Sequence, residues 1–260
     1  MRLFGSTALA GLAGTGVLGA ALVVPVATGA LADDAPAMPA PAIFDEPLVH
    51  VPTFTTAFAC PIPTQPPVDP TYSFYFTRAA YSGGGGRFGG YGRGGGMWRT
   101  DFPEAEVFFT QLVDRLIDID VYLDRGGTNP MCLEDPNLRR FPFLYVVEPG
   151  GMRLSEAEIR GLRSYLEAGG FMMLDDYWGV RETANVEYQL AQVLPGRPIV
   201  DIPLDHPIFH SVYDIEEIRQ VPNIRNGQAI ARGYAGARTD EGDRSEVPSV
   251  RGIFDDDGRL

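Results

Sequence analysis

The sequence predicts an α/β three-layer sandwich built on a mostly parallel sheet, and two observations support this fold class. From about residue 71 onward, apolar segments with strand character alternate with amphipathic segments of helical period. The segment FPFLYVV (141–147) is continuously apolar, as strands are when helices cover both of their faces. Strands and helices that alternate in this way build a sheet with a helical layer on each side.

The first part of the predicted domain contains a strand, a helix and a second strand. The aromatic segment YSFYFTRAAY (72–81) has the composition of a strand. The segment TDFPEAEVFFTQLVDRLI (100–117) predicts a helix, with Asp101 as its N-cap and Glu104 three residues later. The short apolar segment IDVYLD (119–124) predicts the next strand.

A second helix and a second buried strand follow FPFLYVV. The segment SEAEIRGLRSYLEA (155–168) predicts a helix that begins with a capping box between Ser155 and Glu158. The segment FMMLDD (171–176) predicts a buried strand that ends in two aspartates. A third helix is expected over TANVEYQLAQVL (183–194), and the strand-like segment RPIVDIPL follows it.

The C-terminal part of the chain has a different character. Residues 226–260 are rich in turn-forming residues and contain only two short strand-like runs. Asp257-Gly258 is a hairpin turn signal, and only Arg259 and Leu260 follow it. We therefore expect the domain, residues 71–260, to be truncated at its C-terminus.

The N-terminal segment, residues 1–32, has the features of a signal peptide. Arg2 is the only charged residue before Asp33, a long apolar run follows it, and Ala30–Ala32 reads ALA, as a cleavage site does. These features predict export to the periplasm or the medium. The alternative is an uncleaved N-terminal membrane anchor, because the uncharged run is long enough to span a bilayer.

A proline-rich linker is expected between the signal peptide and the domain. Residues 33–70 contain ten of the 22 prolines, which favours extended chain over a packed core. Cys60 lies in this linker and Cys132 in the domain, and neither has the spacing of a metal site. In an oxidising compartment the two cysteines can form a disulfide. The alternative is two unpaired thiols.

Charge and glycine content exclude or disfavour two classes of ligand. The formal net charge is −13, from 21 basic and 34 acidic residues, so nucleic acid is not expected as a partner. Residues 83–96 contain ten glycines, and Gly90, Gly92 and Gly95 match a dinucleotide-binding pattern. A tract this rich in glycine matches many patterns by chance, so we interpret it as a flexible loop and expect no cofactor.

The candidate site lies at the ends of the predicted parallel strands, where ligands bind in open α/β sheets. Asp175 and Asp176 end one strand, and Glu148 follows another at the place where a nucleophile could stand. No Ser or Cys comes directly after that strand, and no G-x-S-x-G motif is present. The sequence therefore offers carboxylates at this edge without an activated nucleophile.

Two histidines four residues apart, His206 and His210, can be considered as metal ligands. With Asp205 or Asp175 they could complete a site if they shared one face of a helix. Pro207 lies between them and argues against a regular helix. The alternative, a structural turn that contains one packed histidine, leads us to expect no metal.

Four segments carry a resemblance to a known family. They are MWRTDFPEAE, FPFLYVVEPGG, LSEAEIRGLRSYLEAGGFMMLDDYWG and DHPIFHSVYDI. Over residues 72–260 the chain resembles the bacterial domain of unknown function 4159, a family similar to the class I glutamine amidotransferase-like superfamily, including trehalose-utilisation-type proteins. The resemblance implies a flavodoxin-like sandwich and no established activity. The catalytic cysteine of the superfamily has no counterpart in residues 148–151.

These observations lead to two functional hypotheses. The first is an exported, non-catalytic binding or assembly module whose partner is a small molecule or an envelope protein, with a membrane contact only if residues 1–32 remain as an anchor. The second is a metal-assisted hydrolase that uses acidic residues and a histidine at the strand ends. Its candidate catalytic residues are Asp175, Asp176 and His206. The candidate binding residues are Trp98, Asp101, Glu148, Asp175, Asp176 and His206.

Overall fold

The computed structural model of the protein describes residues 71–83 and 96–260. The expectations for residues 1–32 and 33–70, and for most of the glycine-rich tract, lie outside these residues. Among the described helices, none is long and apolar enough to cross a bilayer.

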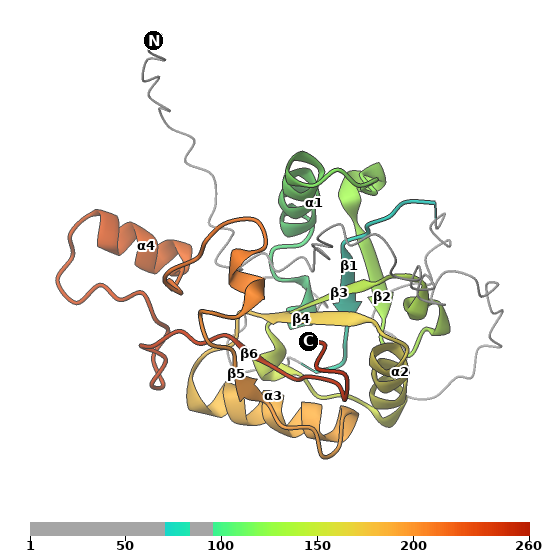
Figure 1. Cartoon of the computed structure of the whole chain (residues 1–260). Helices are drawn as coiled ribbons and strands as arrows, with labels where there is room; N and C mark the ends of the chain where they lie inside the picture. The colour runs from blue at the N-terminus through green and yellow to red at the C-terminus, as the bar shows by residue number, and fades with distance from the viewer. Residues whose placement is uncertain (1–70, 84–95) are drawn as a thin grey trace, which may run out of the picture.

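Four parallel strands form the central sheet, in the order β2-β1-β3-β4 (Figure 1). This is the strand order of a flavodoxin-like fold, and the direction of strand addition reverses between β1 and β3. The structure therefore confirms the predicted fold class. The strands are β1 (Thr77–Ala80), β2 (Asn129–Cys132), β3 (Phe143–Val147) and β4 (Phe171–Asp175).

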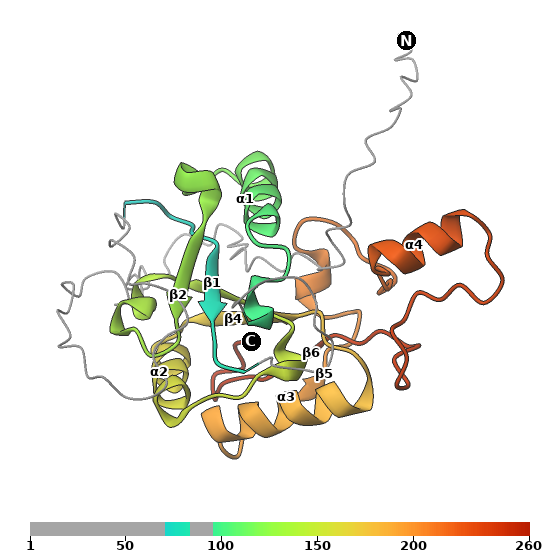
Figure 2. The same cartoon turned by 180° about the vertical axis from the view of Figure 1, so that it is seen from behind.

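Helices cover both faces of this sheet (Figures 1 and 2). On one face Phe109 and Val113 of α1 pack in a buried aromatic cluster with the strands. On the other face Leu162 of α2 and Val193 of α3 pack with Leu144 of β3. The apolar faces of α1 and α2 therefore pack against the sheet, as the sequence predicts. The helices are α1 (Glu104–Leu116), α2 (Glu156–Glu167) and α3 (Gly179–Val193).

The starts of α1 and α2 differ in how well local sequence determines them. In α2, Ser155 Oγ accepts from the Glu158 N–H at 3.3 Å and Glu158 Oε2 accepts from the Ser155 N–H at 2.7 Å, which confirms the capping box. In α1, Asp101 is not the N-cap. That position is Pro103, and Asp101 adopts a left-handed φ of 56° with its carbonyl oxygen accepting from the Ala105 N–H. The backbone of this turn, rather than an aspartate side chain, opens the helix.

Helix α3 begins at Gly179, four residues earlier than the sequence indicates. Asp243 from a distant loop satisfies its first turn: the Asp243 carbonyl oxygen accepts from the Val180 N–H and the carboxylate from the Arg181 N–H. Gly179 has a φ of 71°, and a Cβ there would lie 2.5 Å from the Asp243 carbonyl oxygen. The helix start thus depends on a long-range contact and on a glycine that permits it.

The sequence predicts the first two strands only in part. Within the aromatic segment, Phe74 forms an isolated parallel bridge with Val121, and β1 occupies the four residues from Thr77. The expected strand over 119–124 is reduced to that single bridge. The true edge strand, β2, has the sequence NPMC, whose Pro130 argues against a strand. An edge position tolerates this proline because one side of β2 needs no partner.

The C-terminal part adds a small sheet and an unexpected helix. β5 (Val200–Asp201) and β6 (Arg251–Gly252) pair antiparallel, so the strand-like run near residue 251 has a partner. α4 (Ile224–Ala231) lies in a segment predicted to be turns and stands away from the sheet (Figure 1). Asn223 caps it by accepting from the Asn226 N–H at 2.9 Å.

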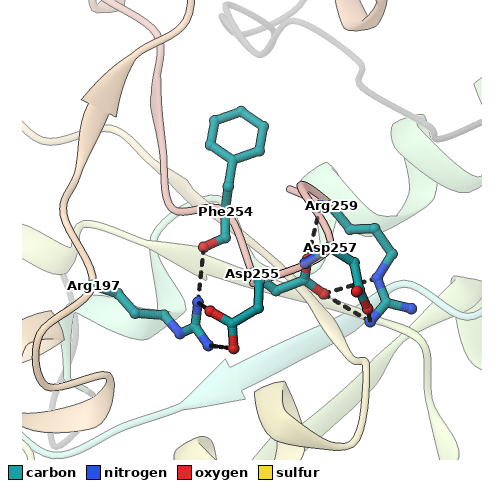
Figure 3. Close-up of polar contacts among 6 residues, drawn as sticks. Arg197, Phe254, Asp255, Asp257 and Arg259 are labelled. Atoms are coloured by element: carbon teal, nitrogen blue, oxygen red, sulfur yellow. Dashed lines mark hydrogen bonds and ion pairs between the residues drawn. The ribbon is translucent and has the colours of Figure 1, made fainter.

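The residues after β6 form a tight turn that is held by ion pairs (Figure 3). The Asp255 N–H donates to the Arg259 carbonyl oxygen, and Gly258 has a φ of 76°, in agreement with the predicted turn at Asp257-Gly258. Arg197, which follows α3, donates to both carboxylate oxygens of Asp256. The turn is thereby fixed to the end of α3.

Candidate functional site

Four carboxylate side chains lie at or just beyond the carboxyl edge of the sheet. Glu148 follows β3, Asp175 ends β4, Asp176 follows it, and Asp101 lies in the loop before α1. Three of them have left-handed φ values: 56° at Asp101, 51° at Glu148 and 61° at Asp176. Non-glycine residues rarely adopt this conformation, and such residues are frequent at functional sites.

Glu148 occupies the strand-to-helix turn after β3, and its main chain is fixed on both sides. Its N–H donates to the Asp175 carbonyl oxygen at 2.9 Å, and the Tyr81 hydroxyl donates to its carbonyl oxygen at 2.9 Å. Burial, followed by repulsion from Asp176 and Glu182 among other carboxylates, raises the pKa of Glu148 to about 8. The Glu148 carboxyl is therefore largely protonated at neutral pH in the absence of a ligand.

The Asp175 carboxylate is held by two donors. The Tyr145 hydroxyl donates to Oδ2 at 2.8 Å, and the Asp176 N–H donates to Oδ1 at 2.9 Å. The Tyr145 ring in turn lies beneath the Arg78 guanidinium, 5.1 Å from ring centroid to Cζ. These contacts fix the orientation of the Asp175 carboxylate.

Asp176 has left the strand and contacts an aromatic neighbour. The indole N–H of half-buried Trp178 donates to Asp176 Oδ1 at 2.5 Å. Burial raises the pKa of Asp176 to about 6; the Trp178 hydrogen bond opposes this rise, whereas repulsion from Asp175 and Glu241 adds to it. Asp176 thus titrates close to neutrality.

Asp101 reaches the edge because a buried arginine organises its loop. Arg78 of β1 is fully buried, pairs with the Glu106 carboxylate, and donates to the carbonyl oxygens of Trp98 and Thr100 at 3.0 and 2.9 Å. Burial raises the pKa of Asp101, and the Arg78 charge partly offsets this effect. Arg78 is thus a nearby positive charge that lowers the pKa of Asp101.

A loop from the C-terminal part also reaches this edge. Glu241 acts electrostatically on both Glu148 and Asp176, and Asp243 caps α3 beside them. Glu182 of α3 accepts from the Trp178 N–H at 2.7 Å through Oε2. No local sequence pattern connects Glu241, Glu182 and Arg78 with the strand ends, so these residues could not be predicted from the sequence.

The two histidines do not join the carboxylates. His206 Nδ1 accepts from the Ile208 N–H at 3.3 Å, and its ring packs 5.8 Å from Phe254. His210 contacts Asp214 and the Leu204 carbonyl oxygen instead of His206. Within residues 71–83 and 96–260, no three His, Cys, Asp or Glu side chains are arranged to hold a metal ion.

Trp98 and Cys132 are both buried. Trp98 is 2% exposed and belongs to the core on the α2 side of the sheet, so its ring does not face solvent. Its indole nitrogen has no hydrogen-bond partner among the described residues. Cys132 is disulfide-bonded. Cys60 is the other cysteine of the chain and lies outside the described residues, so the pairing of the two stays a prediction.

The chemistry of this edge is that of crowded carboxylates. The turn after β3, residues 148–151, presents Glu148 and contains no Ser or Cys, so it lacks the nucleophile that acyl transfer needs. Carboxylates that raise each other's pKa create a strongly negative potential, and a positive charge placed among them relieves it.

Comparison with known proteins identifies a family and no activity. A family model described as a domain of unknown function (DUF4159) matches residues 87–260, which is more than half of the chain. No curated protein matches the chain. The match confirms the family expected from the sequence motifs, whereas the similarity to class I glutamine amidotransferase-like and trehalose-utilisation-type proteins stays a prediction.

Proposed function

We propose that this chain, which belongs to the DUF4159 family, is an exported, non-catalytic module that binds a cationic ligand at the carboxyl edge of its sheet. The observation that carries the proposal is the crowding of Asp101, Glu148 and Asp176 around Asp175. Burial is the largest cause of their raised pKa values, and repulsion among the carboxylates adds to it; a bound cation would stabilise the ionised forms and offset both effects.

An organic cation fits this site better than a bare metal ion. The described carboxylates do not form a three-donor metal arrangement, whereas Asp176 is bonded to the half-buried indole of Trp178. A carboxylate beside an aromatic ring is a combination that recognises ammonium and guanidinium groups, through an ion pair and a cation–π contact. The expected ligand class is therefore a small amine or guanidine, or a Lys or Arg side chain of an envelope protein.

Two further observations support the non-catalytic and exported parts of the proposal. Glu148 occupies the left-handed position after β3 at which an acyl-transfer enzyme would place its nucleophile. Arg2, the apolar run and Ala30–Ala32 predict a signal peptide.

The test measures binding of spermidine and of agmatine by isothermal titration calorimetry. We expect binding at pH 8 that Glu148→Gln and Asp176→Asn each weaken about tenfold or more, because each removes a charge from the site. Binding should also weaken from pH 8 to pH 6, as Glu148 and Asp176 take up protons. Glu156→Gln, at a side chain that is 94% exposed on α2, is the matched control. Absence of binding, or equal binding by all variants, would contradict the proposal.

A hydrolase remains the second candidate, because one observation favours it. Glu148 and Asp176 have pKa values of about 8 and about 6, so at neutral pH one carboxyl is largely protonated while the other is largely ionised. Such a pair can serve as general acid and general base. His206, the third residue of the original hydrolase hypothesis, makes its described contacts elsewhere. Stoichiometric zinc or manganese in the purified protein would favour the metal-assisted form of this candidate.

A further inference from the structure

A polar cavity of about 280 Å³ lies between the start of α4 and the loop that carries Glu241. Among the described residues, those that line it are all polar or glycine. They are Asn223, Asn226, Arg238, Asp240, Glu241 and Gly242. A cavity with this lining suits a small polar group, because an apolar chain would leave the lining groups without hydrogen bonds.

The cavity adjoins the carboxyl edge of the sheet. Gly242 of the cavity is followed by Asp243, whose carbonyl oxygen accepts from the Val180 N–H at 3.1 Å. Val180 lies two residues after Trp178, the aromatic residue of the candidate cation site. Glu241 belongs to both places, because it lines the cavity and its charge adds to the raised pKa values of the edge carboxyls. A ligand held at the edge can therefore extend past Glu241 into the cavity.

Two amide side chains and a carboxylate in the cavity keep hydrogen-bonding capacity for a ligand. The Asn223 amide donates to Glu241 Oε1, and the Asn226 amide donates to the Asp240 carbonyl oxygen at 3.2 Å. An amide group has two N–H donors and an acceptor oxygen, and a carboxylate has two acceptor oxygens. Among the described residues, these bonds leave an N–H of each amide, Asn226 Oδ1 and Glu241 Oε2 without a partner. The cavity thus offers both donors and acceptors.

Hydroxyl groups match this lining better than charged groups do. A hydroxyl both donates and accepts, so it can bond the amide N–H groups and the free oxygens alike. An anion would be repelled by the Glu241 carboxylate, and Arg238 already donates to both Asp240 oxygens. A second ammonium group would be repelled by Arg238 itself. The lining therefore favours a neutral, hydroxylated part of a ligand.

We propose that the cation bound at the edge carries hydroxyl groups, as an amino polyol or an amino sugar does, and that these hydroxyls bind in the cavity. The inference rests on the proposed function, because the ammonium group takes the place assigned there beside Asp176 and Trp178. The hydroxyls bond the amides of Asn223 and Asn226 and the carboxylate of Glu241. The cavity thereby distinguishes among cations that the edge alone would bind alike.

A set of matched probes separates the two parts of the ligand. Glucamine carries an ammonium group on a hydroxylated chain, hexylamine carries it on a chain of equal length without hydroxyls, and sorbitol has the hydroxyls without the ammonium group. In isothermal titration calorimetry of the full chain at pH 8, glucamine should bind about tenfold more tightly than hexylamine, which corresponds to about one net hydrogen bond. Sorbitol should show no binding. 6-Aminohexanoate, which ends in a carboxylate, should bind more weakly than hexylamine because Glu241 repels it.

Asn226→Ala tests the cavity and leaves the cation site unchanged. It should remove the advantage of glucamine over hexylamine and keep hexylamine binding as in the parent, which also shows that the variant is folded. Gln228→Ala, which removes an exposed amide of α4 outside the cavity, is the matched control and should preserve the advantage. If a variant folds poorly, the comparison of the probes on the parent chain still decides.

The results separate this inference from the proposed function. Equal binding of glucamine and hexylamine, or equal behaviour of Asn226→Ala and Gln228→Ala, would overturn the inference and leave the cation site in place. Tighter binding of 6-aminohexanoate than of glucamine would show that the cavity takes an anion, and sorbitol that binds as tightly as glucamine would show that the ammonium group is not needed; either result overturns the inference. If neither amine binds, both proposals are wrong.

Discussion

Replacing Glu148 by glutamine separates the charge of this residue from its shape. Glutamine keeps the size of the side chain and resembles the protonated acid, which predominates at neutral pH because the pKa of Glu148 is raised to about 8. The variant should therefore fold as the parent does. It differs from the parent only where the parent carboxyl ionises, so its stability must be compared as a function of pH.

The sign of the change in stability with pH follows from the pKa of Glu148 in the unfolded and in the folded chain. In the unfolded chain a glutamate ionises near its ordinary pKa of 4.5, whereas folded Glu148 holds its proton until about pH 8. Between these values unfolding releases a proton, so the contribution of Glu148 to stability is lost as the pH rises. The full difference of about 3.5 pH units corresponds to about 5 kcal/mol. Solvent screening of this half-exposed group reduces the expected effect to roughly 1–2 kcal/mol.

The assay is urea denaturation of the parent and Glu148→Gln at pH 5 and at pH 8. The variant should gain roughly 1–2 kcal/mol relative to the parent over this interval. Glu156→Gln, which changes a fully hydrated side chain, should keep a constant difference from the parent. A difference between parent and Glu148→Gln that does not change with pH, or that reverses in sign, would refute the assignment of a buried, repelled carboxyl.

Three other predictions concern the core, a helix start and the N-terminus. Arg78→Met should lower stability by about 3–5 kcal/mol, because it leaves the buried Glu106 carboxylate without its partner, and a second change, Glu106→Leu, should recover part of this loss in urea denaturation. No recovery would contradict the pairing. Ser155→Ala should lower stability by about 1 kcal/mol through loss of the α2 cap, whereas Ser164→Ala within α2 should not; equal effects would contradict the capping role. The N-terminal sequence of the protein isolated from its native host should begin at Asp33, and an intact upstream segment would contradict cleavage.

Elements that are encoded locally could be predicted from the sequence. Helix α2 carries its own capping box at Ser155 and an apolar face, and it appears within one residue of the expected bounds. β3 is continuously apolar and buried along its length, as predicted. β4 was also predicted, but its residues are partly exposed rather than buried, because it is the last strand of the described sheet. In these elements the residues that determine the structure are neighbours along the chain.

Elements that depend on distant contacts could not be predicted in the same way. β2 contains Pro130 and is recognisable as a strand only through its pairing with β1. The first turn of α3 is completed by Asp243, far along the chain. At these two elements tertiary contacts override local propensity. Helix α4 is different, because it has a local Asn223 cap and was missed among the turn-forming residues around it.

The candidate site, too, could be predicted only where its residues follow a local sequence pattern. The rule that ligands bind at the carboxyl ends of parallel strands was sufficient to single out Glu148, Asp175 and Asp176, and the structure places all three at that edge. The rule gave no access to Glu241, because that residue reaches the site through a loop with no sequence signal. His206 was included wrongly. The sequence does not show which way a histidine in a turn points, and the structure places His206 at the start of a short 3-10 helix.

The two adjacent aspartates divide the tasks of the site. Asp175 still belongs to β4, and the Tyr145 hydroxyl and the following N–H occupy its two oxygens, so its contacts are largely satisfied within the protein. Asp176 turns out of the strand with a left-handed backbone, and among the described residues its carboxylate accepts a hydrogen bond from the Trp178 indole. Because the pKa of Asp176 is raised, folding disfavours the ionised form of its carboxyl group. A residue that combines backbone strain with an unfavourable charge contributes little to stability, and under the proposed function a bound cation would offset the unfavourable charge of Asp176.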